Sequence, residues 1–256
     1  MNVWGYSILS VVLVSVISLA GVITLSINRD RLYKTVFFLV ALAVGALLGD
    51  VLVHILPELW EEGDGGLSIP IYVFAGFMLF FVIEKFLRWH HSHGLDSEEA
   101  HQHGPSEDLK HIGYLNLISD GVHNLIDGIL IGTSYLVSVE IGIATTIAVI
   151  LHEIPQEIGD FGLLIYAGFT RSRALFFNFL SALAAILGAV LALVLGGAAE
   201  GFAVIVLPLT AGGFLYIAAA DLVPELKKMN DPVRSAVQFL GVILGFLVMV
   251  GLVFLE

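Results

Sequence analysis

Residues 116–160 read NLISDGVHNLIDGILIGTSYLVSVEIGIATTIAVILHEIPQEIGD, which is two long apolar runs joined by the short connection 137–140. Backbone groups inside lipid must hydrogen-bond within their own segment, so apolar runs of this length predict helices. A connection this short joins antiparallel neighbours. The stretch therefore predicts a tight antiparallel pair of membrane-spanning helices that carry polar side chains in their interior.

The composition of all 256 residues extends this interpretation to the whole chain. Hydrophobic residues make up 58% and charged residues 13%, with a mean hydropathy of +0.95, whereas a soluble globular chain is about a quarter charged. These values exclude a soluble enzyme, a nucleic-acid-binding protein and a disordered chain. The formal net charge of -12 suits cations. Cysteine is absent, so any metal must be held by His, carboxylate or amide ligands.

Eight apolar runs cover the chain, which we expect to be a single all-α integral membrane domain over residues 1–256. Several runs exceed the roughly 20 residues that cross a bilayer, which allows tilt. The expected spans are Trp4–Ser26, Thr35–Leu59, Ile69–Leu87, Gly113–Leu136, Ile141–Gly168, Ala174–Leu195, Phe202–Val223 and Val237–Phe254.

The basic residues test this count. All 11 Lys and Arg residues lie at the ends of the first, third, fifth and seventh runs: ten fall in the connections that follow these runs, and Lys85 lies in the last turn of the third run. By the positive-inside rule, both termini are expected on the non-cytosolic side. Arg29 and Arg31 follow the first run, so we expect that run to be a retained span and not a cleaved signal. A plasma or inner membrane and an organelle membrane are both compatible with this multi-pass topology.

Polar residues share one face of the fourth span. Asn116, Asp120, His123 and Asp127 follow one another at steps of 4, 3 and 4, with Asn124 at the edge of that face. A charge inside a spanning helix costs at least a few kcal/mol, so each of these residues needs a partner or a function.

The fifth span repeats this pattern with His152, Gln156 and Asp160 at steps of four and Glu153 and Glu157 beside them. With the short connection between the spans and about 1.5 Å of rise per residue, both intramembrane histidines are expected some 17–20 Å deep, near the middle of the bilayer. The polar groups of the two spans are therefore expected to converge at one depth.

Imidazole and carboxylate ligands suit Zn, Fe, Mn, Co or Cd better than Cu(I), which prefers sulfur. Either Asp127 or Glu153 is a candidate to bridge two ions. Pro155 removes one helix hydrogen bond and frees the carbonyl of Leu151. The alternatives are hydrogen bonds that hold the helices together, a proton relay, and a pocket for an organic cation.

Further polar residues lie on the second and seventh spans. Asp50, His54 and Glu58 are spaced i, i+4, i+8, and Asp221 precedes Glu225. Each is a candidate to line a pathway, to form a gate or to cap a helix end. For Glu58, Glu84 and Glu225, which lie near the membrane interface, the solvated interpretation is favoured.

The same two spans contain a short repeat. His54-x-x-Pro57-Glu58-Leu59 and Asp221-x-x-Pro224-Glu225-Leu226 match at an offset of 167 residues, which also pairs Gly45 with Gly212. The charge rule makes the two spans run in opposite directions, which predicts an inverted repeat in a 3+2+3 arrangement. Inverted repeats are typical of alternating-access transporters.

One hydrophilic segment, residues 88–112, is predicted to be a flexible cytosolic loop within the domain. His-rich tracts bind transition metals weakly, so a metal sink or sensor is predicted, with a merely solvated loop as the alternative. Its histidines are His90, His91, His93, His101, His103 and His111.

The paired motifs resemble those of the ZIP divalent-metal transporters, and most closely the branch with HNxxDG and HExPHExGD motifs. They read His123-Asn124-Leu-Ile-Asp127-Gly128 and His152-Glu153-Ile-Pro155-Gln156-Glu157-Ile-Gly159-Asp160. The resemblance implies uptake of Zn2+ into the cytosol, with Fe2+, Mn2+, Cd2+ and Co2+ as further candidate ions, by elevator-like alternating access in a homodimer. It implies metal ligands at His123, Asn124, Asp127, His152, Glu153 and Gln156. The branch usually has a second His at the position of Gln156, which bears on affinity, on metal preference and on whether a second ion is fully coordinated.

The expected function is therefore metal transport, with no resident cofactor, no nucleic-acid partner and no enzymatic activity. The ion is expected to enter from the acidic outer side and to leave past Glu157 or Asp160, through the neighbourhoods of His54 and Asp221. One alternative is an intramembrane metalloenzyme, because His152-Glu153-x-x-Gln156 is similar to the HExxH helix of zinc proteases. The other is a metal sensor that moves nothing.

Overall fold

The computed structural model describes residues 2–25, 29–62, 66–95, 105–198, 202–227 and 231–254. Every regular element within these ranges is helical, which confirms the all-α prediction. Four helices begin at a side chain that accepts a hydrogen bond from the backbone N–H three residues later, at 2.9–3.4 Å. The capping residues are Asn2, Ser138, Thr170 and Asp231.

The helices of the first half lead to the polar hairpin. Their bounds are α1 Val3–Ile17, the 3₁₀ segment η1 Ser18–Leu25, α2 Arg29–Gly49, the π-helical segment η2 Asp50–Ile55, α3 Leu56–Glu62, α4 Ser68–Leu95 and α5 Pro105–Val137. The residues of α2, η2 and α3 follow one another without a break. Both ends of the expected loop 88–112 are helical, because α4 continues to Leu95 and α5 begins at Pro105. Residues 96–104 lie outside the described residues, so the expected flexible loop stays a prediction.

The helices of the second half begin with α6, which only Ser138 separates from α5. Their bounds are α6 Val139–Tyr166, α7 Arg171–Ala182, α8 Ala184–Ala198, α9 Phe202–Tyr216, the π-helical segment η4 Ile217–Leu222, α10 Val223–Lys227 and α11 Pro232–Val253. The two π-helical segments occupy positions that differ by the same 167 residues as the sequence repeat.

Six described segments are long and apolar enough to cross a membrane, so the chain is a multi-pass integral membrane protein. They are Val3–Gly21, Lys34–Glu61, Ser68–Phe86, Arg171–Gly196, Val204–Lys227 and Pro232–Val253. Helices α5, with 33 residues, and α6, with 28, are long enough too but carry the polar residues of the hairpin. Large apolar side chains such as Phe74 and Phe239, each 66% exposed, cover the outside of the bundle, where lipid is their natural surrounding.

Among the described helices, three pairs approach closely enough for backbone to touch backbone, and each pair uses one glycine from each helix. A Cβ atom at any of these glycines would lie 1.9–2.1 Å from a carbonyl oxygen of the facing helix. Small residues permit this close packing between membrane helices. The pairs are Gly128 and Gly188 between α5 and α8, Gly45 and Gly245 between α2 and α11, and Gly76 and Gly212 between α4 and α9.

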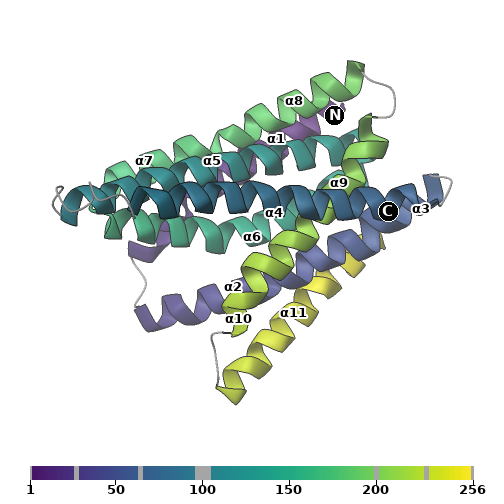
Figure 1. Cartoon of the computed structure of the whole chain (residues 1–256). Helices are drawn as coiled ribbons and strands as arrows, with labels where there is room; N and C mark the ends of the chain where they lie inside the picture. The colour runs from purple at the N-terminus through teal and green to yellow at the C-terminus, as the bar shows by residue number, and fades with distance from the viewer. Residues whose placement is uncertain are drawn as a thin grey trace.

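Both ends of the chain lie at one end of the bundle, and the first residues of α2, α7 and α11 lie at the other (Figure 1). Helices α4, α5 and α6 run the length of the bundle. Helices α2 and α11 form a pair inclined to them (Figure 1). The polar hairpin of α5 and α6 therefore lies within the bundle, between the α7–α8 side and the inclined pair.

Candidate metal centre

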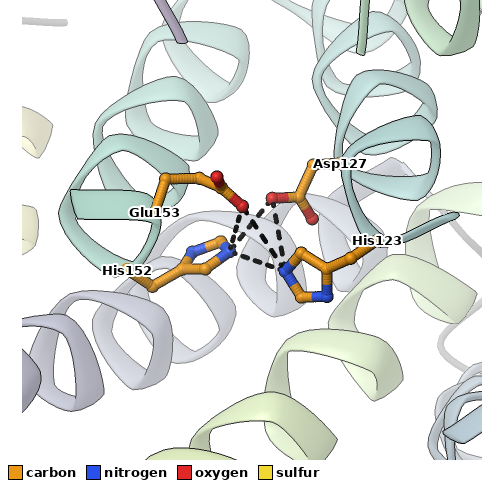
Figure 2. Close-up of side chains that lie close together, drawn as sticks. All are labelled: His123, Asp127, His152 and Glu153. Atoms are coloured by element: carbon orange, nitrogen blue, oxygen red, sulfur yellow. Dashed lines mark hydrogen bonds and ion pairs between the residues drawn. The ribbon is translucent and has the colours of Figure 1, made fainter. Parts of the chain in front are cut away.

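Two turns of α5 and α6 bring two histidines and two carboxylates together (Figure 2). His152 Nε2 lies 3.0 Å from Asp127 Oδ2 and 3.3 Å from His123 Nε2. His123 Nε2 lies 3.6 Å from Glu153 Oε1 and 3.8 Å from Asp127 Oδ2, and His152 Nε2 lies 3.8 Å from Glu153 Oε1. Ligand atoms around a tetrahedral zinc ion with bonds of about 2.0–2.1 Å are about 3.3–3.4 Å apart. Five of the six distances among the four atoms of this His–carboxylate cluster, at 3.0–3.8 Å, are close to this value, and the remaining pair, Asp127 and Glu153, belongs to a group whose ligand atoms lie within 4.8 Å of one another.

The tautomer of His152 favours metal binding. Its Nδ1 lies 3.1 Å from the backbone oxygen of Ala148, one turn earlier on α6. A carbonyl oxygen only accepts, so Nδ1 is the donor in this contact. Nε2 faces the cluster, and the neutral ring with its proton on Nδ1 is the form that offers the Nε2 lone pair to a metal ion. Metal-binding histidines are usually oriented in this way by a hydrogen bond from the other ring nitrogen.

The cluster is buried and short of hydrogen-bond donors. Asp127 is fully buried, and His152 and Glu153 are each 1% exposed. Among the described residues, no donor forms a hydrogen bond with either oxygen of Asp127 or with Oε1 of Glu153. Buried carboxylate oxygens without a partner are costly, and a bound cation removes that cost. Burial and the lack of donors are both expected of a cation site.

The two predicted amide ligands lie beside this cluster but direct their nitrogen atoms elsewhere. Asn124 Nδ2 donates to Asp120 Oδ1 at 3.1 Å, and Gln156 Nε2 donates to the same oxygen at 3.4 Å. The Oδ1 atom of buried Asn124 has no partner within the described part of the chain. Both amides therefore lie between the His–carboxylate cluster and Asp120.

Asp120, Glu157 and Asp160 form a second group, whose carboxylate oxygens lie within 4.8 Å of one another. We call these three residues the carboxylate triad. Asn116 Nδ2 donates to Asp160 Oδ1 at 3.0 Å, so all four predicted pathway residues of the hairpin lie together.

A cavity of about 240 Å³ reaches both groups of ligands. His123, Gln156, Asp120, Asp160 and Asn116 line it, and it explains why the His123 side chain is 20% exposed while the rest of the cluster is buried. Its wall also includes Glu84 of α4 and Tyr216 of α9, and the Tyr216 hydroxyl donates to the Glu84 carboxylate.

The predicted exit past His54 stays a prediction, but His54 does not line the cavity that reaches the cluster. It lies on η2 beside the first residues of α6, whereas Asp160 lies near the last residues of α6. His54 lines a separate hollow of about 360 Å³ with Glu58, Glu61 and Glu140. Between this hollow and the cluster, α6 carries the fully buried side chains of Ala148 and Val149.

Asp50, His54 and Thr145 form a buried polar contact at the inner side of that hollow. The Thr145 hydroxyl donates to Asp50 Oδ2 at 3.0 Å, and His54 Nδ1 lies 3.7 Å from Asp50 Oδ1. The side chain of Asp221, on η4, lies outside the described part, so its pathway role stays a prediction. The side chains of His90, His91 and His93 also lie outside the described part, as do residues His101 and His103 entirely, so metal binding by these histidines stays a prediction.

Asn178 and Ser181 of α7 also contact the carboxylate triad. The sequence analysis did not predict them as site residues. Asn178 Nδ2 donates to Glu157 Oε2 at 2.8 Å, and Ser181 Oγ donates to Asp120 Oδ2 at 2.5 Å. The feature of the sequence that could have indicated their role is the single amide, Asn178, within an apolar run.

These features define a polytopic membrane protein with a buried metal-ligand cluster on two adjacent helices. A protein-family model described as ZIP Zinc transporter matches residues 1–253. The chain belongs to the ZIP zinc transporter family, as the motifs predict. It is thus a member of a transporter family and not of the zinc proteases.

Curated relatives agree with this assignment. Zinc transporter ZIP13 of Mus musculus is 36% identical over 253 residues, covering 83% of this chain and 68% of the relative. Zinc transporter ZIP13 of Homo sapiens is 36% identical over 263 residues, covering 83% and 69%. Zinc transporter SLC39A7 of Mus musculus is 30% identical over 339 residues, covering 100% and 71%.

Proposed function

We propose that this protein carries divalent transition-metal ions, zinc foremost, into the cytosol by alternating access, and that the His–carboxylate cluster is its transport site. The observation that carries the proposal is the buried set of two imidazoles and two carboxylates at ligand spacing. The relatives named above are zinc transporters, and this donor set suits zinc. Fe2+, Mn2+, Cd2+ and Co2+ are further candidate cargoes.

The proposed topology has eight spans in a 3+2+3 arrangement, with both termini on the non-cytosolic side and the α5–α6 hairpin in the centre. Support comes from the π-helical segments at Asp50–Ile55 and Ile217–Leu222, which match at the offset of the sequence repeat. The glycine-packed pairs support it too. The second, third, seventh and eighth spans are α2, α4, α9 and α11. In an inverted repeat the second span corresponds to the seventh and the third to the eighth, so the α2–α11 pair corresponds to the α9–α4 pair.

The proposed ion route runs from one hollow to the other. The hollow around Glu58, Glu61 and Glu140 is acidic and lies at the end of α6 that the charge rule assigns to the outside. The 240 Å³ cavity lies at the end that the rule assigns to the cytosol and reaches His123. In this conformation the transport site therefore opens toward the cytosol, with the apolar layer of Ala148 and Val149 closing the outer side.

The amides beside the cluster support two further proposals. The unpartnered Oδ1 of Asn124 offers an oxygen ligand for a second ion that Glu153 or Asp127 would bridge. Gln156 offers its amide oxygen in the same way if its side chain turns from Asp120. We also propose a homodimer within the lipid bilayer, and weak metal binding by the histidines of residues 88–112.

The proposed function is tested by influx of radioactive zinc into proteoliposomes that contain the purified chain. Saturable influx above that of protein-free liposomes, reduced by competing Mn2+, Fe2+ and Cd2+ in a definite order, is the expected result. Zinc binding without influx, in folded protein of both orientations, would favour the sensor. Cleavage of an added membrane peptide without influx would favour the enzyme.

Gln156→His is expected to lower the half-saturating zinc concentration by roughly tenfold and to increase discrimination against Mn2+. An imidazole binds zinc better than an amide oxygen does, and changes around metal ligands alter affinity by about 10–100-fold. Zinc and manganese influx are measured for both proteins in parallel. Gln156→Leu is the control, and an equal gain in that variant would attribute the effect to the lost contact with Asp120.

Zinc influx at constant free zinc is expected to fall by roughly tenfold from about pH 7.5 to about pH 5.5. Metal binding requires neutral imidazoles and ionised carboxylates, so protons compete with the ion as the pH falls. The initial rate is measured with equal pH on both sides of the membrane. A flat profile over this range would contradict imidazole ligation.

A further inference from the structure

The carboxylate triad is separate from the transport site. Asp120 precedes His123 by three residues on α5, and Glu157 follows Glu153 by four on α6. Both steps lead toward the Asn116 and Asp160 ends of their helices by about one helical turn, which is about 5.4 Å. The amides of Asn124 and Gln156 occupy the space between the two groups and bond to Asp120.

The triad contains unused ligand atoms. Glu157 and Asn178 are fully buried. Within the described part of the chain, Oε1 of Glu157 and Oδ1 of Asn178 have no hydrogen-bond partner. Asn178 directs its nitrogen to the other oxygen of Glu157, at 2.8 Å, so its amide is held in place while its own oxygen stays unpaired. An unpaired buried oxygen is unfavourable unless a ligand or a proton satisfies it.

The triad also lacks a compensating positive side chain. Among the described residues, no Lys or Arg forms an ion pair with Asp120, Glu157 or Asp160. Asp120 and Asp160 hydrogen-bond to each other, and the other donors to the triad are neutral: Asn116, Asn124, Gln156, Asn178 and Ser181. Three carboxylates within 4.8 Å of one another repel unless a cation or protons neutralise them.

We propose that the triad and Asn178 form a second divalent-ion site made of oxygen atoms alone, which receives the ion that the transport site releases toward the cytosol. Asp120, Glu157 and Asp160 supply carboxylate oxygens, and Asn178 supplies its unpaired amide oxygen. This inference rests on the proposed function and adds to it a place for the ion between the transport site and the exit.

The chemistry of the two sites gives the transfer a direction. The transport site has two imidazole nitrogens, which zinc favours, whereas an oxygen-only site suits Mn2+ and holds zinc less tightly. An ion that moves from one to the other is therefore exchanged into a site from which it leaves more readily. The 240 Å³ cavity touches His123 and Gln156 of the first region and Asp120 and Asp160 of the second, so it joins them.

The competing interpretation is that protons alone neutralise the triad. The two interpretations differ in a direct observable, because only an ion site binds an additional Mn2+ without nitrogen ligands. The experiment uses the full chain purified in detergent, with the six histidines of residues 88–112 replaced by serine so that the loop contributes no metal. Mn2+ binding is counted by electron paramagnetic resonance, and nitrogen ligands are detected by electron spin-echo modulation.

The expected result is two classes of bound Mn2+, one with nitrogen modulation and one without. Glu157→Gln should remove the class without nitrogen and keep the other, which also shows that the variant is folded. His123→Ala/His152→Ala should do the reverse. Asn178→Leu should weaken the class without nitrogen by at least about tenfold, whereas its matched control Asn178→Asp, which keeps an oxygen there, should not.

Zinc influx separates this inference from the proposed function. In Glu157→Gln the maximal rate should fall by about fivefold to tenfold while the half-saturating zinc concentration does not rise, because release is slowed and capture is intact. Wild-type protein that transports zinc but binds only nitrogen-coordinated Mn2+ would overturn the second site and leave the proposed function standing. Absence of saturable influx in the wild type would overturn the transfer role together with the proposed function.

Discussion

His123→Ala/His152→Ala is expected to reduce saturable zinc influx by on the order of a hundredfold or more. The change removes both nitrogen ligands and leaves Asp127 and Glu153 as two close carboxylates. Loss of a group that merely orients a metal ligand costs about 10–100-fold in affinity, so loss of two direct ligands costs at least as much. Influx of radioactive zinc into proteoliposomes with equal protein content measures the effect.

The control for this variant removes an aromatic ring from α6 without touching the cluster. Tyr166→Ala changes a side chain that is 71% exposed on the outside of the bundle, and its influx should match the wild type. The double variant should also elute as a monodisperse species and keep the oxygen-only Mn2+ class. Wild-type influx in a folded double variant would show that the ion crosses elsewhere.

Gly128→Ala is expected to destabilise the protein by about 3 kcal/mol or more and to reduce influx accordingly. The added Cβ would lie 1.9 Å from the backbone oxygen of Ala185 and 2.6 Å from its carbonyl carbon. Backbone cannot escape by changing rotamer, so α5 and α8 must separate. Because Gly128 follows Asp127, the displacement also moves a ligand of the transport site.

Gly162→Ala is the matched control, since it makes the same change on α6 where a Cβ meets no atom within 4 Å. Thermal unfolding, followed by size-exclusion chromatography after heating, compares the two variants with the wild type. Equal unfolding midpoints for the two variants would contradict the close packing of α5 on α8.

The helical architecture was predictable because a backbone in lipid must form helices or a closed barrel, and long continuous apolar runs fit only helices. The spacing of His123, Asp127, His152 and Glu153 was enough to expect them together. The π-helical segments were not predictable. The few polar residues of these stretches, Asp50, His54 and Asp221, are too few to show the number of residues per turn. The short motif that repeats at an offset of 167 residues includes part of both π-helical segments, but it does not indicate a π-helical conformation.

The contribution of α7 was missed for a related reason. Asn178 and Ser181 are three residues apart in an otherwise apolar segment, and a single amide in such a segment is more often satisfied by its own helix. Only the tertiary packing of α7 against α5 and α6 brings it to Glu157. The hollow that His54 lines was not predictable either, because the pattern shows which face of a helix a residue occupies but not which hollow that face lines.

The fixed tautomer of His152 has a consequence for the membrane potential. With the proton held on Nδ1, the ring binds metal without changing charge, so the two carboxylates of Asp127 and Glu153 alone set the charge of the transport site. One divalent ion then makes the loaded site neutral, whereas the empty, ionised site carries two negative charges. Moving two elementary charges across a membrane potential of 100 mV changes their electrostatic energy by about 4.6 kcal/mol. An inside-negative potential would therefore leave inward movement of the loaded site unaffected and accelerate the outward return of the empty one.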